Sequence, residues 1–130
     1  MAANVKWESE EQKVIVFTFE NYWTLDEYYD VLKQSNVMMD QVQHKVNMII
    51  DVRASKSVPS GFMSALRTVS KHPHANSGKV AMIGMSPFIR AFILAVRQVL
   101  RKKPEDSWMT IVNNYQEAHD LFRAEEKVNT

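Results

Sequence analysis

Two short apolar runs constrain the fold of this chain most strongly. Residues Val46–Ile50 and Val80–Ile83 contain almost no polar side chains, and apolar runs of this length are typical of strands that are covered on both faces of a sheet. Each run precedes a segment with the spacing of an amphipathic helix, at residues 60–71 and 87–103. Strands that alternate with helices pair in parallel through right-handed crossovers. The sequence therefore predicts an α/β fold with a mostly parallel sheet.

A hairpin and a capped helix are expected before the first apolar run. Val5–Trp7 and Val14–Phe19 are rich in β-branched and aromatic residues and predict two antiparallel strands. Thr24 and Glu27 have the spacing of a capping box, so a helix should follow to about Met39. Apolar residues recur along it at three- and four-residue steps, which predicts a core-facing stripe of Leu25, Tyr28, Tyr29 and Leu32.

The second half of the chain continues the alternation. A helix from Ser60 to Lys71, a strand over 80–84, a helix over 87–103 and a strand over 108–112 are expected in turn. Asn114 and Glu117 repeat the capping-box spacing at the start of a last helix. The predicted order is β-β-α-β-α-β-α-β-α in one domain over residues 1–130, with a mixed, mostly parallel sheet.

Composition excludes several classes of chemistry. The 130 residues are 45% hydrophobic and 24% charged, which is typical of one globular domain. The chain has no Cys and only 3 Gly, so thiol chemistry, disulfides and a glycine-rich phosphate loop are excluded. The N-terminus is acidic where a secretory signal would be apolar, so we expect a soluble, cytoplasmic protein.

Charge is distributed very unevenly along the chain. Residues 1–51 carry 4 basic and 9 acidic side chains, residues 52–104 carry 10 basic and no acidic ones, and residues 105–130 carry 2 and 6. In the helix over 87–103, Arg90, Arg97 and Arg101 lie opposite the apolar stripe. This basic face is either an ordinary solvated surface or a contact for an anionic surface, such as an acidic protein or phospholipid headgroups. Nucleic acid is not expected, because no aromatic residue interleaves with the arginines.

A serine-rich loop lies between the strand that ends at Asp51 and the next helix. Ser55, Ser57 and Ser60 precede the helix N-terminus, and Gly61 follows them. One interpretation is that one of these serines is the N-cap of the helix. The other is a regulatory or anion-binding loop, because helix N-termini favour an anion or an added phosphate.

The outward side of the helix over 60–71 is a second candidate contact. Met63 and Arg67 are expected to face away from the core, which suits an adaptable interface but is also ordinary for a surface. No motif typical of catalysis occurs, and His72-Pro73-His74 is expected to be a surface loop rather than a metal site. We therefore expect no catalytic residue, metal or cofactor.

The strand that ends in Ile49-Ile50-Asp51, the serine-rich loop after it and the Ser60-Gly61 pair together resemble the STAS/SpoIIAA-like family. In anti-sigma-factor antagonists of this family, a serine in an Asp-Ser-Ser-Gly motif is phosphorylated to switch binding of a protein partner. Val58-Pro59-Ser60-Gly61 stands at that stretch here. The chain is more similar to the SpoIIAA-like proteins without this switch, which are related in fold to CRAL-TRIO lipid-binding domains.

These observations predict a non-catalytic binding or regulatory module. It would engage a protein partner through the loop and helix at residues 52–71 and through the basic face. The alternative is a carrier of a small apolar or lipid-like ligand in a pocket between the helices and the sheet. The sequence is also compatible with a homodimer.

Overall fold

The computed structural model describes residues 2–71, 74–84, 91 and 109–128. Within these residues, five strands form one sheet in the order β1-β2-β3-β4-β5. All neighbouring strands are parallel except β1 and β2, which form the expected antiparallel hairpin. The strands are β1 (Ala3–Trp7), β2 (Val14–Phe19), β3 (Val46–Asp51), β4 (Ser77–Ile83) and β5 (Met109–Val112). The predicted α/β class with a mixed sheet is therefore confirmed.

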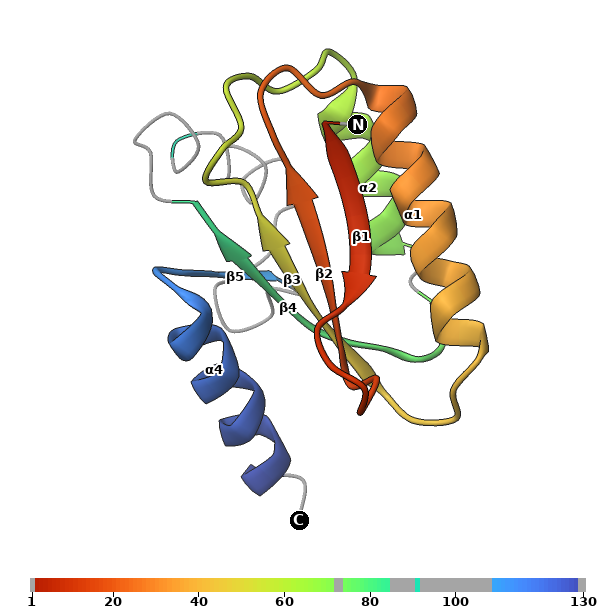
Figure 1. The fold of residues 1–130 in the computed structure, drawn as a ribbon, viewed down its shortest axis with the longest axis vertical. Helices are drawn as coiled ribbons and strands as arrows, with labels where there is room; N and C mark the ends of the chain where they lie inside the picture. The colour runs from red at the N-terminus through yellow and green to blue at the C-terminus, as the bar shows by residue number, and fades with distance from the viewer. Residues whose placement is uncertain (1, 72–73, 85–90, 92–108, 129–130) are drawn as a thin grey trace.

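Helices cover both faces of the sheet (Figure 1). They are α1 (Leu25–Asp40), α2 (Phe62–Lys71) and α4 (Tyr115–Val128). One core lies between the sheet and the α1/α2 layer, and includes Phe17, Tyr28 and Phe62. A smaller core on the opposite face includes Val16, Ile49 and Phe122, and α4 covers it. In the described part of the chain, no helix is long and apolar enough to cross a membrane.

The two cores explain why β3 is mostly apolar. Val46, Met48 and Ile50 point toward the α1/α2 layer. Ile49, which lies between Met48 and Ile50, points toward α4. Side chains of a strand alternate between faces, so a strand covered on both sides needs apolar residues at consecutive positions. The expectation of a strand covered on both faces is confirmed.

β4 begins three residues earlier than the sequence predicted. Asn47 of β3 accepts a hydrogen bond from the Lys79 backbone through its Oδ1 (2.9 Å), which continues the contact between the strands toward their start. Gly78 permits this approach, because a Cβ at that position would lie 2.4 Å from Asn47 Oδ1. The register shifts between Val46 and Met48 at this point. β1 likewise begins at Ala3, two residues before the predicted strand.

Helix α1 has the predicted capping box but a different buried stripe. The Thr24 side chain accepts from the Glu27 backbone, and the Glu27 side chain accepts from the Thr24 backbone. Tyr29, expected in the core, is 49% exposed. The buried residues of α1 are Tyr28, Val31, Ser35 and Met39. Successive helix residues are about 100° apart, so Tyr29 lies on a different side of the helix from this buried face.

The cap of α4 forms only half of the predicted box. Asn114 Oδ1 accepts from the Glu117 backbone at 2.9 Å, as expected. The Glu117 carboxylate accepts instead from the backbone and side-chain amides of Asn113, at 2.7 and 3.2 Å. Asn113 offers two donors where the Asn114 backbone offers one, so the carboxylate is better satisfied one residue earlier.

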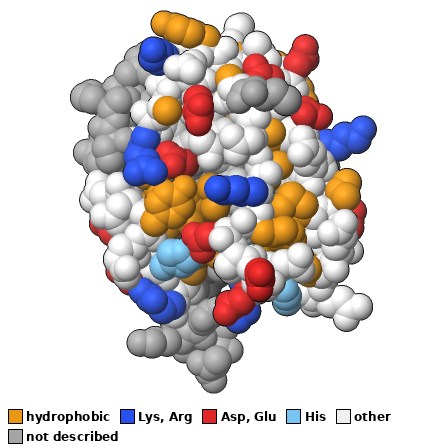
Figure 2. All heavy atoms as spheres, viewed as in Figure 1, with side chains coloured by type: hydrophobic (Ala, Val, Ile, Leu, Met, Phe, Trp, Pro, Cys, Tyr) orange, Lys and Arg blue, Asp and Glu red, His pale blue; other side chains and the backbone are white. Residues whose placement is uncertain are grey.

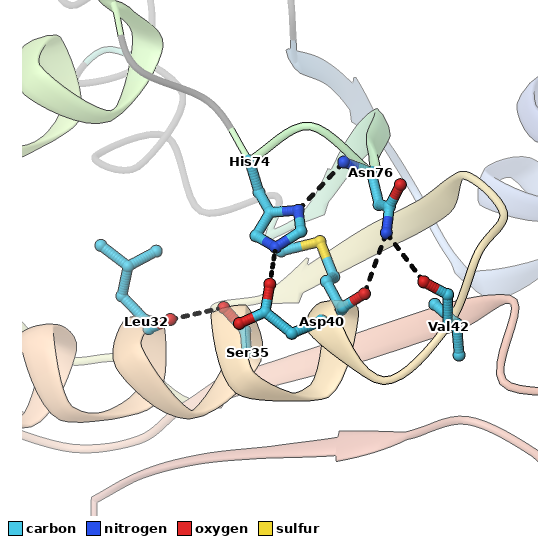
Figure 3. Close-up of polar contacts among 7 residues, drawn as sticks. Leu32, Ser35, Asp40, Val42, His74 and Asn76 are labelled. Atoms are coloured by element: carbon cyan, nitrogen blue, oxygen red, sulfur yellow. Dashed lines mark hydrogen bonds and ion pairs between the residues drawn. The ribbon is translucent and has the colours of Figure 1, made fainter.

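Hydrogen bonds join the segment before β4 to the C-terminal end of α1 (Figure 3). His74 contacts Asp40 through Nε2 at 2.7 Å, and its Nδ1 accepts from the Asn76 backbone at 2.9 Å. The Asn76 side chain donates to the Met39 and Val42 carbonyls, both at 3.0 Å. His74 lies in a loop, as predicted, but its side chain is only 14% exposed because these contacts hold it against the helix end.

All of the predicted helix over 87–103 except residue 91 lies outside the described residues, and so do Arg90, Arg97 and Arg101. The basic face therefore stays a prediction. The elements on either side of this segment follow the predicted order.

Candidate binding surface

Two loops meet at the carboxyl ends of the parallel strands. One loop (residues 20–24) follows β2, and the other (residues 52–61) follows β3; both lie at the same end of the molecule (Figure 1). The Asn21 backbone donates to Ala54 O and accepts from the Lys56 N–H, each at 2.8 Å. Together we call these residues the loop surface. In parallel sheets this edge is where ligands and partners usually bind.

Asn21 can make both bonds because of its backbone conformation. Its φ of 52° lies in the left-handed region, which asparagine tolerates better than most residues. Thr18, at the end of β2, is paired with Asp51, at the end of β3, so the two loops start from neighbouring positions. The sheet register therefore sets their proximity.

An ion pair fixes the first part of the loop after β3. Arg53 donates from Nε to Asp51 Oδ1 (3.0 Å) and from Nη2 to Asp51 Oδ2 (2.7 Å), and its backbone N–H donates to Oδ1 (3.1 Å). The Tyr115 hydroxyl, at the start of α4, donates to Oδ2 at 3.2 Å. The Arg53 guanidinium lies 5.5 Å from the Tyr115 ring centroid, within the range of a cation–π contact.

The electrostatics of this cluster favour the charged pair. Burial alone would raise the pKa of Asp51, but the hydrogen bonds from the Arg53 side chain and backbone outweigh it and hold that pKa below its ordinary value. The hydrogen bond to Asp51 raises the pKa of Arg53. Burial, with the nearby Asp51 charge, raises the pKa of the Tyr115 hydroxyl. Asp51 is therefore a carboxylate and Tyr115 a neutral donor at neutral pH.

A second set of contacts joins the middle of the two loops. The Trp23 indole Nε1 donates to Ser55 Oγ at 2.8 Å, and Ser55 Oγ donates to Ser57 O at 3.0 Å. The Trp23 ring is buried and packs edge-on against Phe62 at the start of α2, with 5.0 Å between ring centroids. Ser55 thus has a structural role in the loop.

The predicted serine N-cap is wrong for Ser55, and the helix start is built differently. Gly61 precedes α2 with a φ of 86°, and the Ala65 backbone donates to Gly61 O at 3.1 Å. The turn is closed by a bond from the Phe62 N–H to Pro59 O (3.2 Å). Among the described residues, the hydroxyls of Ser57 and Ser60 have no hydrogen-bond partner. Glycine at the position next to the helix has no side chain to cap it.

The structure does not show whether the predicted contact residues on α2 lie near the loop surface. Met63 and Arg67 belong to α2, but their side chains are outside the described part of the structure. Within the described residues, no group of three or more His, Asp and Glu could hold a metal ion.

Sequence reasoning missed Tyr22 on the loop surface and Tyr115 at the start of α4. Tyr22 is 70% exposed between the two anchored positions Asn21 and Trp23. Tyr115 reaches Asp51 across 64 residues of sequence, so no local spacing could reveal the pair. The available signal was the position of Asp51 at a strand end, which placed the loop correctly.

Neither a scan against models of known protein families nor a search of curated proteins finds a match to this chain.

Proposed function

We propose that this chain is a non-catalytic binding or regulatory module of the STAS/SpoIIAA-like type that engages a protein partner through the loop surface. The observation that carries the proposal is the anchoring of the loop after β3. Asp51, Asn21 and Trp23 hold it at three successive positions, while the side chains of Tyr22, Arg53 and Lys56 stay exposed.

A surface of this kind suits protein recognition. A fixed backbone loses little conformational freedom on binding, so less of the interaction energy is lost to ordering. Tyrosine and arginine are enriched among the residues that dominate interface energies. The Arg53 side chain is 54% exposed although Asp51 orients it, so its free edge is available to a partner.

The same geometry argues against a catalytic carboxylate. A general base at neutral pH needs a pKa near the working pH and an accessible lone pair. Asp51 instead has a lowered pKa, and both of its oxygens accept hydrogen bonds from Arg53. This is the chemistry of a structural anchor, which supports a binding role.

Ser57 and Ser60 are the proposed regulatory positions. Their hydroxyls make no hydrogen bond within the described chain, whereas the Ser55 hydroxyl accepts from Trp23 and donates to Ser57. A phosphate on either would lie in the same loop as Arg53 and Lys56 and next to the start of α2. Phosphorylation would therefore change the charge of the loop surface without removing one of its anchors.

Site-specific photo-cross-linking in an extract of the host tests this function. A photoreactive phenylalanine analogue replaces Tyr22 on the loop surface, or Tyr29 on α1 as the matched control, since Tyr29 is also a tyrosine and is 49% exposed. We expect one protein to be attached from position 22 and not from position 29. Adding Arg53→Gln to the position-22 probe should reduce that product by roughly ten-fold, the loss expected for one interface hot spot.

Two results would contradict the proposal. Equal labelling from positions 22 and 29 would mean that the loop surface has no preferred partner. A lipid-like molecule retained by the gently purified protein in native mass spectrometry, with no protein attached from position 22, would favour the carrier function instead.

A further inference from the structure

Strand β1 is an edge of the sheet with unused backbone groups. At its two ends, the Glu8 N–H donates to Val14 O (2.9 Å) and Ala2 O accepts from the Glu20 N–H (2.7 Å). In an antiparallel pair, residues that bond to the partner strand alternate with residues whose backbone groups point away. The even-numbered residues of β1 therefore face β2. The N–H and C=O groups of Ala3, Val5 and Trp7 point outward, where the described residues supply no partner.

The apolar core also extends to this edge without being closed there. Ala3 is fully buried, whereas Val5 and Trp7 are only half-buried although they pack against the same core. In Figure 1 β1 lies in front of α2, so Figure 2, drawn from the same side, shows the face of the sheet away from the core that holds Val5 and Trp7. A further strand beside β1 would place its own side chains next to Val5 and Trp7, as β1 places its side chains next to those of β2.

The edge lacks most of the features that protect free strands from pairing. Protected edges commonly carry a proline, a bulge, an inward-pointing charge or exposed lysines. β1 has no proline, and its register with β2 runs without interruption from Ala3 to Trp7. Lys6 is the one such feature of β1, and its charge points away from the α1/α2 core.

We propose that a second copy of this chain pairs with β1 through its own β1, in an antiparallel arrangement centred on Val5, so that the two sheets become one. A two-fold axis at Val5 places Val5 opposite Val5, Ala3 opposite Trp7 and Asn4 opposite Lys6. The small Ala3 thus faces the large Trp7, and no two like charges are directly opposed, as stable cross-strand pairs require. This self-complementarity favours a second copy over an unrelated extended peptide. The proposal does not rest on the proposed function.

Single-cysteine cross-linking tests the register directly, because the natural chain has no Cys. In Val5→Cys, the two cysteines would occupy one hydrogen-bonded pair, with Cα atoms about 5.5 Å apart, within the range that a disulfide spans. In the matched control Asn4→Cys, the two cysteines would be offset by two residues along the strands and roughly 8 Å apart. Residue 4 is more exposed than residue 5, so random collisions would favour the control.

With diamide as oxidant and micromolar protein, we expect Val5→Cys to form a covalent dimer roughly ten-fold or more faster than Asn4→Cys, because pairing raises the effective thiol concentration. Equal rates, or a faster Asn4→Cys reaction, would overturn the proposal.

Sedimentation velocity on the natural chain supplies an independent measurement. We expect the dimer fraction to rise with protein concentration, and Val5→Pro to sediment as a monomer. Proline removes an outward N–H and leaves the bonds from β1 to β2 in place, so circular dichroism should be unchanged. A natural chain that stays monomeric up to the highest concentration would overturn the proposal. Should Val5→Pro fail to fold, the two cysteine variants still decide the question.

Discussion

At the scale of single residues, Asp51 links three parts of the molecule. It ends β3, binds the side chain and backbone of Arg53, and accepts from Tyr115 at the start of α4. A carboxylate that accepts several hydrogen bonds is stabilised in its charged form. The residue therefore joins the sheet, the loop after β3 and the helix layer around α4 through one charge.

The lowered pKa of Asp51 predicts how stability depends on pH. A carboxyl group whose pKa is lower in the folded state contributes stability above its ordinary value of 3.8, and loses that contribution as the pH falls through its folded value. The free energy of unfolding should therefore fall on acidification below about pH 4. In Asp51→Asn, we expect a protein that is roughly 1–3 kcal/mol less stable at pH 7 and loses less between pH 5 and pH 3.

Urea unfolding at several pH values measures this dependence. Glu11→Gln, which removes an exposed acid from the turn between β1 and β2, is the control for the loss of one negative charge. It should follow the natural chain. A full acid-induced loss in Asp51→Asn would show that other groups are responsible.

At the scale of elements, the start of α2 depends on backbone conformation rather than on a side-chain cap. Gly61 has a φ of 86°, in the region that residues with a Cβ rarely adopt, and a Cβ there would lie 3.3 Å from Leu25 Cδ2. Its position fixes the direction in which α2 leaves the loop surface. Ser60, one residue before it, is exposed.

Substitutions at these two neighbouring positions should therefore differ in effect. Gly61→Ala should destabilise the fold by about 1 kcal/mol or more, since alanine at a positive φ is strained. Ser60→Ala should change stability by no more than about 0.5 kcal/mol, because its hydroxyl makes no bond within the described chain. Chemical denaturation measures both. A loss near 1 kcal/mol in Ser60→Ala would instead identify Ser60 as the N-cap.

At the scale of the whole molecule, the central strands join two cores into one unit. Ile15 of β2 is fully buried in the core under α1 and α2, and Ile49 of β3 is fully buried in the core under α4. Both strands send alternate side chains into each core. Neither core can be lost without disturbing strands that the other one needs.

We therefore expect Ile15→Ala and Ile49→Ala each to lower the free energy of unfolding by about 2–5 kcal/mol. Both variants should shift the same single unfolding transition. Tryptophan fluorescence reports on the first core through Trp7 and Trp23, and far-ultraviolet circular dichroism reports on all helices. The two signals should coincide in the natural chain and in both variants. An earlier loss of helical signal in Ile49→Ala alone would mean that α4 unfolds separately.

Much of the architecture could be predicted because it depends on local patterns. The nearly continuous apolar run Val46–Ile50 is typical of a strand covered on both faces, and Thr24 with Glu27 is a self-contained cap. Tyr29 was wrongly predicted to face the core, because the spacing of apolar residues along a helix does not show which of them lies at the centre of the buried face. That centre depends on which side of α1 the sheet and α2 occupy.

The sequence by itself determined the α/β class, the antiparallel start of the sheet and the place of the loop after β3, because hydrophobic period, cap spacing and strand ends are properties of neighbouring residues. Only the tertiary structure decided the members of the loop surface and the free edge of β1. Asp51 meets Tyr115, and Trp23 meets Ser55, after strand pairing has brought distant segments together. Such contacts depend on register and layer packing, which no local spacing in the chain encodes.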